Sequence, residues 1–329
     1  MSTRAATHAN SWYTGNKSKL NSQLESWLAA VGTSIEGVGE LPPDGARVII
    51  APHAGYSYSG PAAAWAYKSL DVSTAKRVFI LGPSHHVYLD HCDLSACKYY
   101  ATPLGNLAVD TETLRELHEC GENFGWMTQS TDEDEHSIEM HLPYIYKVLD
   151  LAGKVDSVKV VPILVGAINT QKEKVYGKVL AKYLKDPENV FVISSDFCHW
   201  GSRFSYTHYY TALPTNPTPE SPSTKLDHRT RTPTGPHQIH ESIEILDKLG
   251  MSTIETGSHD RFAEYLQATR NTICGRHPIG VMMAAIEEVA KESEQKGGAR
   301  FKFVRYEQSS KVCDPTDSSV SYASAFAVV

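Results

Sequence analysis

The sequence predicts an α/β fold with a mainly parallel central sheet flanked by helices on both faces. Three continuous apolar runs carry this prediction: ARVIIAP at 46–52, KRVFILGPS at 76–84 and NVFVISSDF at 189–197. Apolar runs without alternation are typical of strands that are buried on both faces, as in parallel sheets. Helical patterns separate these runs, as crossovers between parallel strands require. We expect a single domain over 1–329, with no linker dividing it.

The other elements follow from local patterns. Helical periodicity predicts helices at 17–30, 60–70, 111–120, 170–184, 240–250, 259–270 and 277–295. Less regular strands are expected within 93–110 and at 157–167, and two strands at 300–308 and 320–329 end the chain. Pro61 and Pro278 lie near helix starts, where proline is favoured. Thr111 is a plausible N-cap and Gly250 a typical helix stop.

Residues 211–236 differ in composition from the rest of the chain. The segment TALPTNPTPESPSTKLDHRTRTPTGP holds six prolines and only two leucines. Such a segment cannot bury enough apolar surface to order itself, so we expect a mobile surface insertion. A docking or phosphorylation loop is the alternative interpretation.

Composition excludes several classes of partner. The net charge is −7 and 41% of the residues are hydrophobic, with no basic block. Nucleic acid and anionic membranes are therefore poor partners for this chain. No apolar stretch approaches the roughly 18 residues of a membrane span, and the start lacks the apolar core of a signal peptide. We expect a cytoplasmic protein, with the nucleus as a further location, whose six cysteines are free thiols.

Side chains that bind metals or protons follow three of the predicted strands. His53 follows the first strand, His85 and His86 follow the second, and Asp196 and His199 follow the third. In open α/β sheets, ligands bind outside the carboxyl ends of the strands. A single histidine is more often structural, but three coincident strand ends favour a common site.

Two further segments offer candidate site residues. Cys274 precedes the helix predicted at 277–295, and a helix N-terminus favours a thiolate. A buried, inert cysteine is an equally good interpretation. His136 and Glu139 could share a helix face at the edge of the same site, although the zinc-protease pattern HExxH is absent. The alternative is an acidic helix start followed by a packed turn, which we favour for His141.

The order of these motifs resembles that of the Memo family. The segments that carry the resemblance are APHAGYSYSG, LGPSHH, DEDEHSIEMHLPY, SSDFCHWG and NTICGRHPIG. SWYTG near the start and TDSSVSYA near the end extend it over nearly the whole chain, whereas the proline-rich insertion is longer than this family leads us to expect. The resemblance implies a fold similar to that of LigB-type extradiol dioxygenases, which are non-haem iron enzymes with a mainly parallel sheet.

The resemblance also implies a metal centre. His53 and His85 match the two histidine ligands of those enzymes, and Cys274 stands where a glutamate would complete the ligand set. Asp196 and His199 would line the same pocket as the catalytic groups, with His199 placed like the acid/base histidine.

Four more side chains complete the expected pocket. Trp12 and Tyr58 resemble its walls, and we add His86 and His136 as pocket residues. Two imidazoles and a thiolate suit iron or copper and leave at least one coordination position open. Metal affinity should fall as the histidines protonate near their ordinary pKa of about 6.5, and more steeply if a thiolate binds.

Three functions fit these residues. The first is an intracellular iron- or copper-binding protein with a redox role in signalling, cell motility and the cytoskeleton, or metal homeostasis, and so a metal-dependent oxidoreductase. The second is a non-enzymatic adaptor whose pocket takes a phosphotyrosine-containing peptide or signalling protein. The third is an active dioxygenase on an unknown substrate, which is disfavoured because Cys274 replaces the carboxylate ligand.

Overall fold

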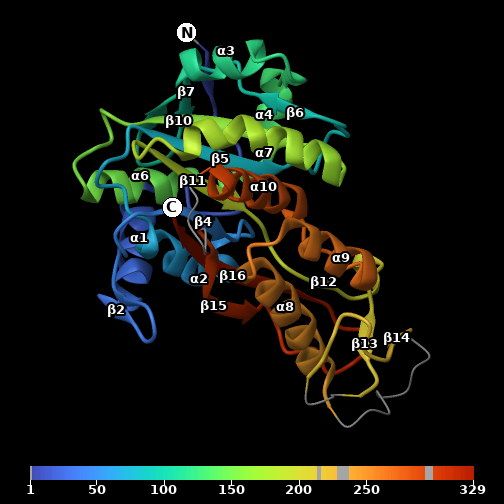
Figure 1. Ribbon diagram of the computed structural model, residues 1–329. Helices are drawn as coiled ribbons and strands as arrows, with labels where there is room; N and C mark the ends of the chain where they lie inside the picture. The colour runs from blue at the N-terminus through green and yellow to red at the C-terminus, as the bar shows by residue number, and fades with distance from the viewer. Residues whose placement is uncertain (1, 213–215, 228–236, 293–298) are drawn as a thin grey trace.

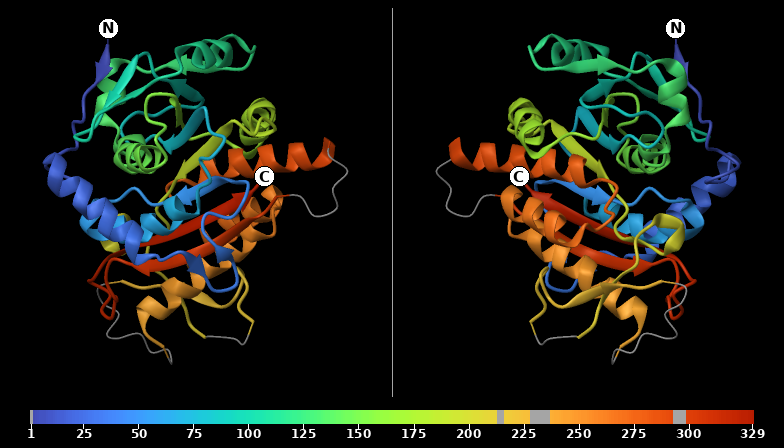
Figure 2. Two further views of the ribbon diagram at one scale, coloured as in Figure 1. Left: turned by 90° about the vertical axis from the view of Figure 1, so that its left-hand side faces the viewer. Right: turned by 90° about the vertical axis from the view of Figure 1, so that its right-hand side faces the viewer.

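The computed structural model describes residues 2–212, 216–227, 237–292 and 299–329. Over these residues the largest sheet has nine strands, ordered β12-β16-β4-β11-β5-β10-β6-β9 with β15 paired to β16. Helices lie around this sheet in all the views (Figure 1, Figure 2). The predicted α/β class, with a mainly parallel central sheet flanked by helices, is confirmed.

The middle of the sheet consists of parallel strands. They are β4 (Ala46–Ala51), β11 (Asn189–Ser194), β5 (Arg77–Pro83) and β10 (Lys159–Val165), and each pairs in parallel with the next. Every residue of β4 and β11 is buried. The continuous apolar runs therefore form strands covered on both faces, with all their carboxyl ends at one edge of the sheet.

Antiparallel strands close the sheet on each side. Beside β4 lie β16 (Ser319–Val328), β15 (Phe301–Gln308) and the short β12 (His199–Trp200). Beside β10 lies β6 (Cys92–Leu94), which pairs in parallel with β9 (Phe124–Trp126). Three short strands form a separate sheet: β1 (Thr3–Arg4), β7 (Tyr99–Ala101) and β8 (Asn106–Ala108). A further two-stranded sheet pairs β2 (Ser34–Ile35) with β3 (Gly39–Glu40).

Different helices cover the two faces of the parallel strands. On one face Phe79 packs against Phe191 and against Tyr183 of α7 (Thr170–Leu184). On the other, a Cβ added to Gly82 would collide with Ser137 of α5 (His136–Glu139). The remaining helices are α1 (Lys17–Ala30), α2 (Tyr56–Ser69), α3 (Thr111–Glu119), α4 (Gln129–Asp134), α6 (Leu142–Leu151), α8 (Ile239–Glu255), α9 (His259–Thr269), α10 (Arg276–Glu292) and the one-turn η1 (Ser202–Phe204).

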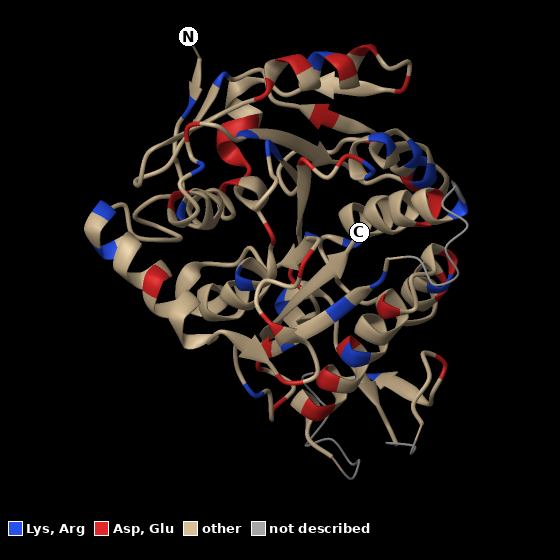
Figure 3. Cartoon of the chain, turned by 60° about the vertical axis from the view of Figure 1, so that its left-hand side comes forward, with Lys and Arg blue, Asp and Glu red and all other residues tan. Residues whose placement is uncertain are grey.

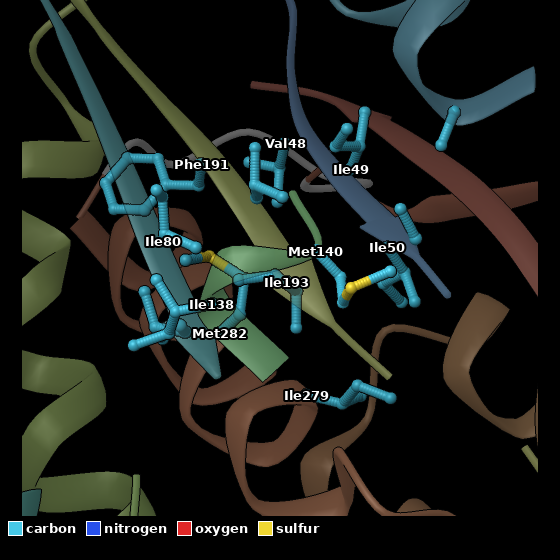
Figure 4. Close-up of a cluster of buried hydrophobic side chains, with 14 of the residues drawn as sticks. Val48, Ile49, Ile50, Ile80, Ile138, Met140, Phe191, Ile193, Ile279 and Met282 are labelled. Carbon is cyan, nitrogen blue, oxygen red and sulfur yellow. The ribbon is translucent and has the colours of Figure 1, made fainter. Parts of the chain in front are cut away.

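The core forms where these layers meet. Apolar side chains from the parallel strands pack against α10 and the α5 region (Figure 4). The labelled members are Val48, Ile49, Ile50, Ile80, Ile138, Met140, Phe191, Ile193, Ile279 and Met282. All ten are less than 2% exposed. This packing holds the strand ends rigidly, which is what a site built on them requires.

Several predicted helix bounds were wrong. Helix α2 begins at Tyr56, so Pro61 lies inside it and not in its first turn. The N-cap of α3 is Asp110. Helix α8 runs through Gly250, where a Cβ would meet the Tyr265 ring at 2.9 Å, so this glycine provides room for packing and does not end the helix. Helix α6 was not predicted.

The structure describes part of the proline-rich segment 211–236. Within it, β14 (Ser223–Lys225) pairs antiparallel with β13 (His208–Tyr210), and Leu226 is buried. The expectation that the segment cannot order itself is therefore wrong for these residues. Residues 213–215 and 228–236 lie outside the described part of the chain.

Charged residues of both signs are interspersed over the elements in the view of Figure 3. This distribution agrees with the modest net charge of −7. None of the described helices combines the length and the apolar character that crossing a membrane requires.

Candidate metal centre

The carboxyl ends of three adjacent strands bring the predicted site residues together. His53 lies two residues after β4, His85 two residues after β5 and Asp196 two residues after β11. The His53 and His85 rings are 5.2 Å apart, centroid to centroid. The site therefore arises from strand order, because β11 lies between β4 and β5 in the sheet.

His53 is buried and held in one tautomer. Its Nδ1 lies 2.6 Å from the Ser194 hydroxyl, which itself donates to the Ser137 carbonyl at 2.7 Å. Because the only hydroxyl proton is used on that carbonyl, Nδ1 must carry the proton that His53 shares with Ser194. The lone pair is then on Nε2, which is the arrangement that a metal-binding imidazole needs. Burial, with neighbouring histidines contributing, lowers the pKa of His53 well below its ordinary value.

His85 is oriented by a carboxylate. Its Nδ1 lies 2.9 Å from Glu135 Oε1, and its backbone N–H donates to Oε2 at 2.7 Å. Burial alone would raise the pKa of Glu135, but the hydrogen bonds and charge of His85 outweigh it and lower that pKa to about 2. Glu135 is therefore an ionised acceptor for Nδ1–H, which again leaves Nε2 free to bind a metal.

His136, the first residue of α5, completes the group. Its ring stacks on His85 with centroids 4.4 Å apart and lies 4.4 Å from the Trp12 ring. Burial and the nearby His85 lower the pKa of His136 to about 3, although Glu135 opposes the shift. Its Nδ1 is buried and forms no hydrogen bond with the described residues, although Glu135 Oε1 lies 3.5 Å away. The imidazole is thus neutral near pH 7, with an unsatisfied nitrogen.

These three histidines can hold a metal ion together. One ligand atom from each of His53, His85 and His136 lies within 4.8 Å of the other two. Neutral imidazoles bind iron, copper and zinc, and three protein ligands leave positions open for another group. The donor set, the two fixed tautomers and the orphaned nitrogen of His136 all fit a transition metal.

Cys274 lies beside this group. Its Sγ is 3.3 Å from His53 Nε2 and accepts a hydrogen bond from the Asp196 backbone N–H at 3.1 Å. Burial, with the Asp196 charge second, raises the pKa of the Cys274 thiol, so the protein without metal holds a thiol. Of the two interpretations left open for Cys274, the raised pKa agrees with a buried thiol in the absence of metal, because burial outweighs the backbone hydrogen bonds to the sulfur.

Asp196 contacts His53, and His199 lies on the segment that follows Asp196. Asp196 is buried and accepts a hydrogen bond from the His53 N–H at 2.8 Å, and burial raises the pKa of its carboxyl group. His199 Nδ1 faces the carbonyls of Phe197 and Thr272, at 2.9 and 3.2 Å. Since carbonyls only accept, Nδ1 carries a proton and Nε2 is the free acceptor.

The expected pocket residues lie near the surface. Trp12 stacks against His136, and the His86 ring meets the same imidazole edge-on at 5.9 Å. Tyr58, in the first turn of α2, is 61% exposed. Among the described residues, no hydrogen bond or ring contact joins Tyr58 to the histidines. Its place in the pocket therefore stays a prediction.

Comparisons with known proteins identify the family of this chain. A family described as Memo-like protein matches residues 4–326. The chain belongs to the Memo family. Protein MEMO1 of zebrafish (Danio rerio) is 47% identical over 329 residues, covering 100% of this chain and 98% of the relative. Human (Homo sapiens) Protein MEMO1 is 47% identical over 320 residues, covering 97% and 95%. A MEMO1 family protein of Schizosaccharomyces pombe is 45% identical over 325 residues, covering 98% of each.

Two residues of this Memo-family site were missed. Glu135 and Ser194 each accept the Nδ1 proton of a cluster histidine. Glu135 immediately precedes His136, so an acceptor adjacent to a candidate histidine was the available signal. Nothing local in the sequence marks Ser194, because its role depends on how β11 lies beside β4.

Glu139, which we considered as a site residue on the same helix face as His136, has another role. Glu139 accepts from Arg4 at 2.6 Å and from the Tyr13 hydroxyl at 2.7 Å, and thereby ties the N-terminal segment to α5. It reaches the site only through His8, whose Nδ1 is 2.9 Å away and whose ring lies 6.0 Å from His136. His141 is buried and bonded through Nδ1 to Tyr67, which agrees with a structural residue.

Proposed function

We propose that this protein binds iron or copper at the carboxyl edge of its sheet and uses the metal in redox signalling. The observation that carries the proposal is the group of three imidazoles whose ligand atoms lie within 4.8 Å of one another. His53, His85 and His136 would hold the ion, and Cys274 would approach it from beside His53. The bound metal would supply a one-electron couple, Fe(II)/Fe(III) or Cu(I)/Cu(II).

The surrounding residues suit such a role. The Cys274 thiol lies 3.3 Å from His53 Nε2 and can lose its proton when a metal binds. The free Nε2 of His199 offers a proton acceptor nearby. All the cysteines are free thiols, as in reducing compartments, which supports our placing this function in the cytoplasm or nucleus. Cell motility and metal homeostasis are the processes that we assign to it.

Metal titration of purified, metal-stripped protein tests the proposal. We expect one equivalent of Fe(II) or Cu(I) to bind the parent protein, and His85→Ala to lose most of this binding. His53→Ala and His136→Ala should behave like His85→Ala, whereas His277→Ala, on α10, is the matched control. Metal contents of His53→Ala, His85→Ala and His136→Ala that equal the parent's would overturn the proposal.

Cys274→Ser identifies the ligand set. If Cys274 is a ligand, this variant loses affinity and a sulfur-to-metal charge-transfer band that the parent shows. If three imidazoles suffice, both the affinity and the spectrum stay as in the parent. Either result leaves the metal proposal intact, because that proposal is decided by the histidine variants.

An adaptor is the second candidate, favoured by the exposed aromatic residues. Trp12 is 37% exposed while stacking on His136, and Tyr58 is 61% exposed. A phosphotyrosine-containing peptide or signalling protein could pair its phosphate with the histidines and its ring with Trp12. Saturable binding of a phosphotyrosine peptide to metal-stripped protein, lost in Trp12→Ala, is the expected result. Absence of saturable binding would contradict it.

A further inference from the structure

A second pocket lies away from the histidine cluster, between α7, α9 and α10. Figure 1 shows these three helices side by side. The cavity has a volume of about 530 Å³, within the range of small-molecule sites. One wall is apolar and includes Phe262 and Leu266 of α9. Such a wall fits an apolar or aromatic body rather than a bare ion.

The pocket carries two arginines without acidic partners. Arg270 and Arg276 both line it, and within the described residues neither forms an ion pair with a carboxylate. The Arg276 side chain donates to the Ile273 carbonyl at 3.4 Å. Guanidinium groups without acidic partners at a cavity wall are typical of phosphate and carboxylate sites.

The acidic residue in the wall already has hydrogen-bond partners. Glu173 is buried and accepts through Oε2 from His259 at 2.7 Å and through Oε1 from His277 at 2.6 Å. Both carboxylate oxygens are thus occupied by imidazoles. Glu173 is therefore not a partner for Arg270 or Arg276, and both guanidinium groups remain available to pair with a phosphate.

Backbone and side-chain groups add to the anion site. Helices α7 and α10 both begin at the cavity, since Thr170 and His277 line it, and their N-termini carry partial positive charge. Asn271 also lines it and is 4% exposed. Its Oδ1 is buried with no partner in the described part of the chain, so a hydroxyl of a ligand could donate to it.

We propose that this pocket binds a small organic phosphate, whose phosphate group pairs with Arg270 and Arg276 and whose apolar body lies on Phe262 and Leu266. This site is distinct from the metal centre. The segment that lines it continues directly into Cys274, and Thr272 bonds both the N–H and the carbonyl of His199, at 2.8 and 3.0 Å. A ligand here would therefore contact the chain segment that carries Cys274 and that bonds to His199 through Thr272.

Replacing Arg270 by glycine tests the proposal without destabilising the fold. It ends α9 in the left-handed conformation, with φ of 54°, which favours glycine. Arg270→Gly thus removes the guanidinium while relieving backbone strain, so its thermal midpoint should stay close to the parent's. Loss of ligand binding in this variant cannot be attributed to loss of the fold.

The probe is 1-naphthyl phosphate, titrated calorimetrically into metal-stripped protein that has been dialysed free of chelator. We expect saturable binding that weakens about tenfold in Arg270→Gly and again in Arg276→Gln. Arg261→Gln, an exposed arginine on the same helix outside the cavity, is the matched control and should bind as the parent does. 1-Naphthoate and inorganic phosphate should both bind more weakly.

Equal affinity of the parent and the Arg270→Gly/Arg276→Gln double variant would overturn this assignment. So would the absence of saturable binding, or tighter binding of 1-naphthoate than of the phosphate. His85→Ala, which disables the proposed metal centre, should leave naphthyl phosphate binding unchanged. Loss of binding in Trp12→Ala with retention in both arginine variants would place the probe at the histidine cluster and also overturn the assignment.

Discussion

Two groups of histidines in this protein lie in opposite electrostatic settings. His53, His85 and His136 gather at the sheet edge, where burial and mutual proximity lower the pKa of His53 and His136. His259 and His277 instead lie on either side of one carboxylate, Glu173. There, hydrogen bonding and the charge of Glu173 outweigh burial and raise the pKa of His259.

The difference lies in what each imidazole faces. In the three-histidine group, Ser194 and Glu135 bind the Nδ1 atoms of His53 and His85, so Nε2 is the nitrogen that each of these two can offer to a metal ion. In the Glu173 group the carboxylate takes the central position, and His259 and His277 each bond to one of its oxygens. The same residue type thus forms a candidate ligand group in one region and surrounds a carboxylate in the other.

Removing one histidine from each group is the strongest test of this comparison. His85→Ala should weaken metal binding more than 100-fold, because loss of an outer hydrogen-bond partner alone costs roughly 10–100-fold. His277→Ala should leave metal affinity within about twofold of the parent, as expected for a residue outside the ligand group. Competition titrations with Fe(II) and Cu(I) measure both. Equal losses in the two variants would break the comparison.

Removing the carboxylate that bonds to His85 should have the next largest effect on metal affinity. Glu135→Gln keeps the shape of the side chain but removes the charge that orients His85 Nδ1–H, so metal affinity should fall by roughly 10–100-fold. Glu173→Gln is the control and should leave metal affinity unchanged. An unchanged affinity in Glu135→Gln would show that His85 is positioned by packing alone.

The pH dependence of metal binding separates sulfur from nitrogen ligation. Because burial raises the pKa of the Cys274 thiol, a metal must displace its proton, and affinity should rise about tenfold per pH unit between pH 7 and 9. Cys274→Ser should be flat over this window, where imidazoles are neutral. The loss of affinity near pH 6.5 that we expected from protonation of the imidazole ligands stays a prediction. The lowered pKa of His136, about 3, means that this imidazole would compete with protons only at lower pH.

The smallest effect concerns the stability of the Glu173 group. The raised pKa of His259 stabilises the fold below pH 6.5 and is lost as pH rises through its folded value. The lowered pKa of Glu173 stabilises the fold above pH 4.5 and is lost as pH falls through its folded value. Glu173→Gln should therefore lower the free energy of unfolding most between these limits, by about 2 kcal/mol.

Urea denaturation from pH 4 to 9 measures this profile. Glu264→Gln, an exposed carboxylate on α9, is the control and should change stability little at any pH. A destabilisation of Glu173→Gln that does not vary with pH would mean that packing, and not ionisation, holds the pair.

The sequence predicted the strands well and the site in part. Continuous apolar runs identified β4, β5 and β11, because burial on both faces leaves a local pattern. Strand ends also indicated His53 and His85. By contrast, Gly250 was wrongly predicted to end a helix. Its packing against Tyr265 depends on α9, which follows in the chain, so no local pattern indicates it.

The three-histidine group was likewise only partly predictable from the sequence. His136 was expected only as a pocket residue, yet its ring stacks on His85, and Cys274 contacts His53 without belonging to the three-histidine group. These relations depend on how α5 and the segment before α10 approach the sheet. No spacing of residues along the sequence indicates how these segments approach the sheet.

By itself, the sequence determined the parallel sheet, the family motifs and the delivery of metal-binding side chains to one edge, since hydrophobic periodicity and strand direction are properties of neighbouring residues. Only the tertiary structure decided which histidines converge, which nitrogen of each is free, and whether Cys274 holds its proton. Those properties depend on burial and on charges a few ångströms away in space, contributed by residues distant along the chain.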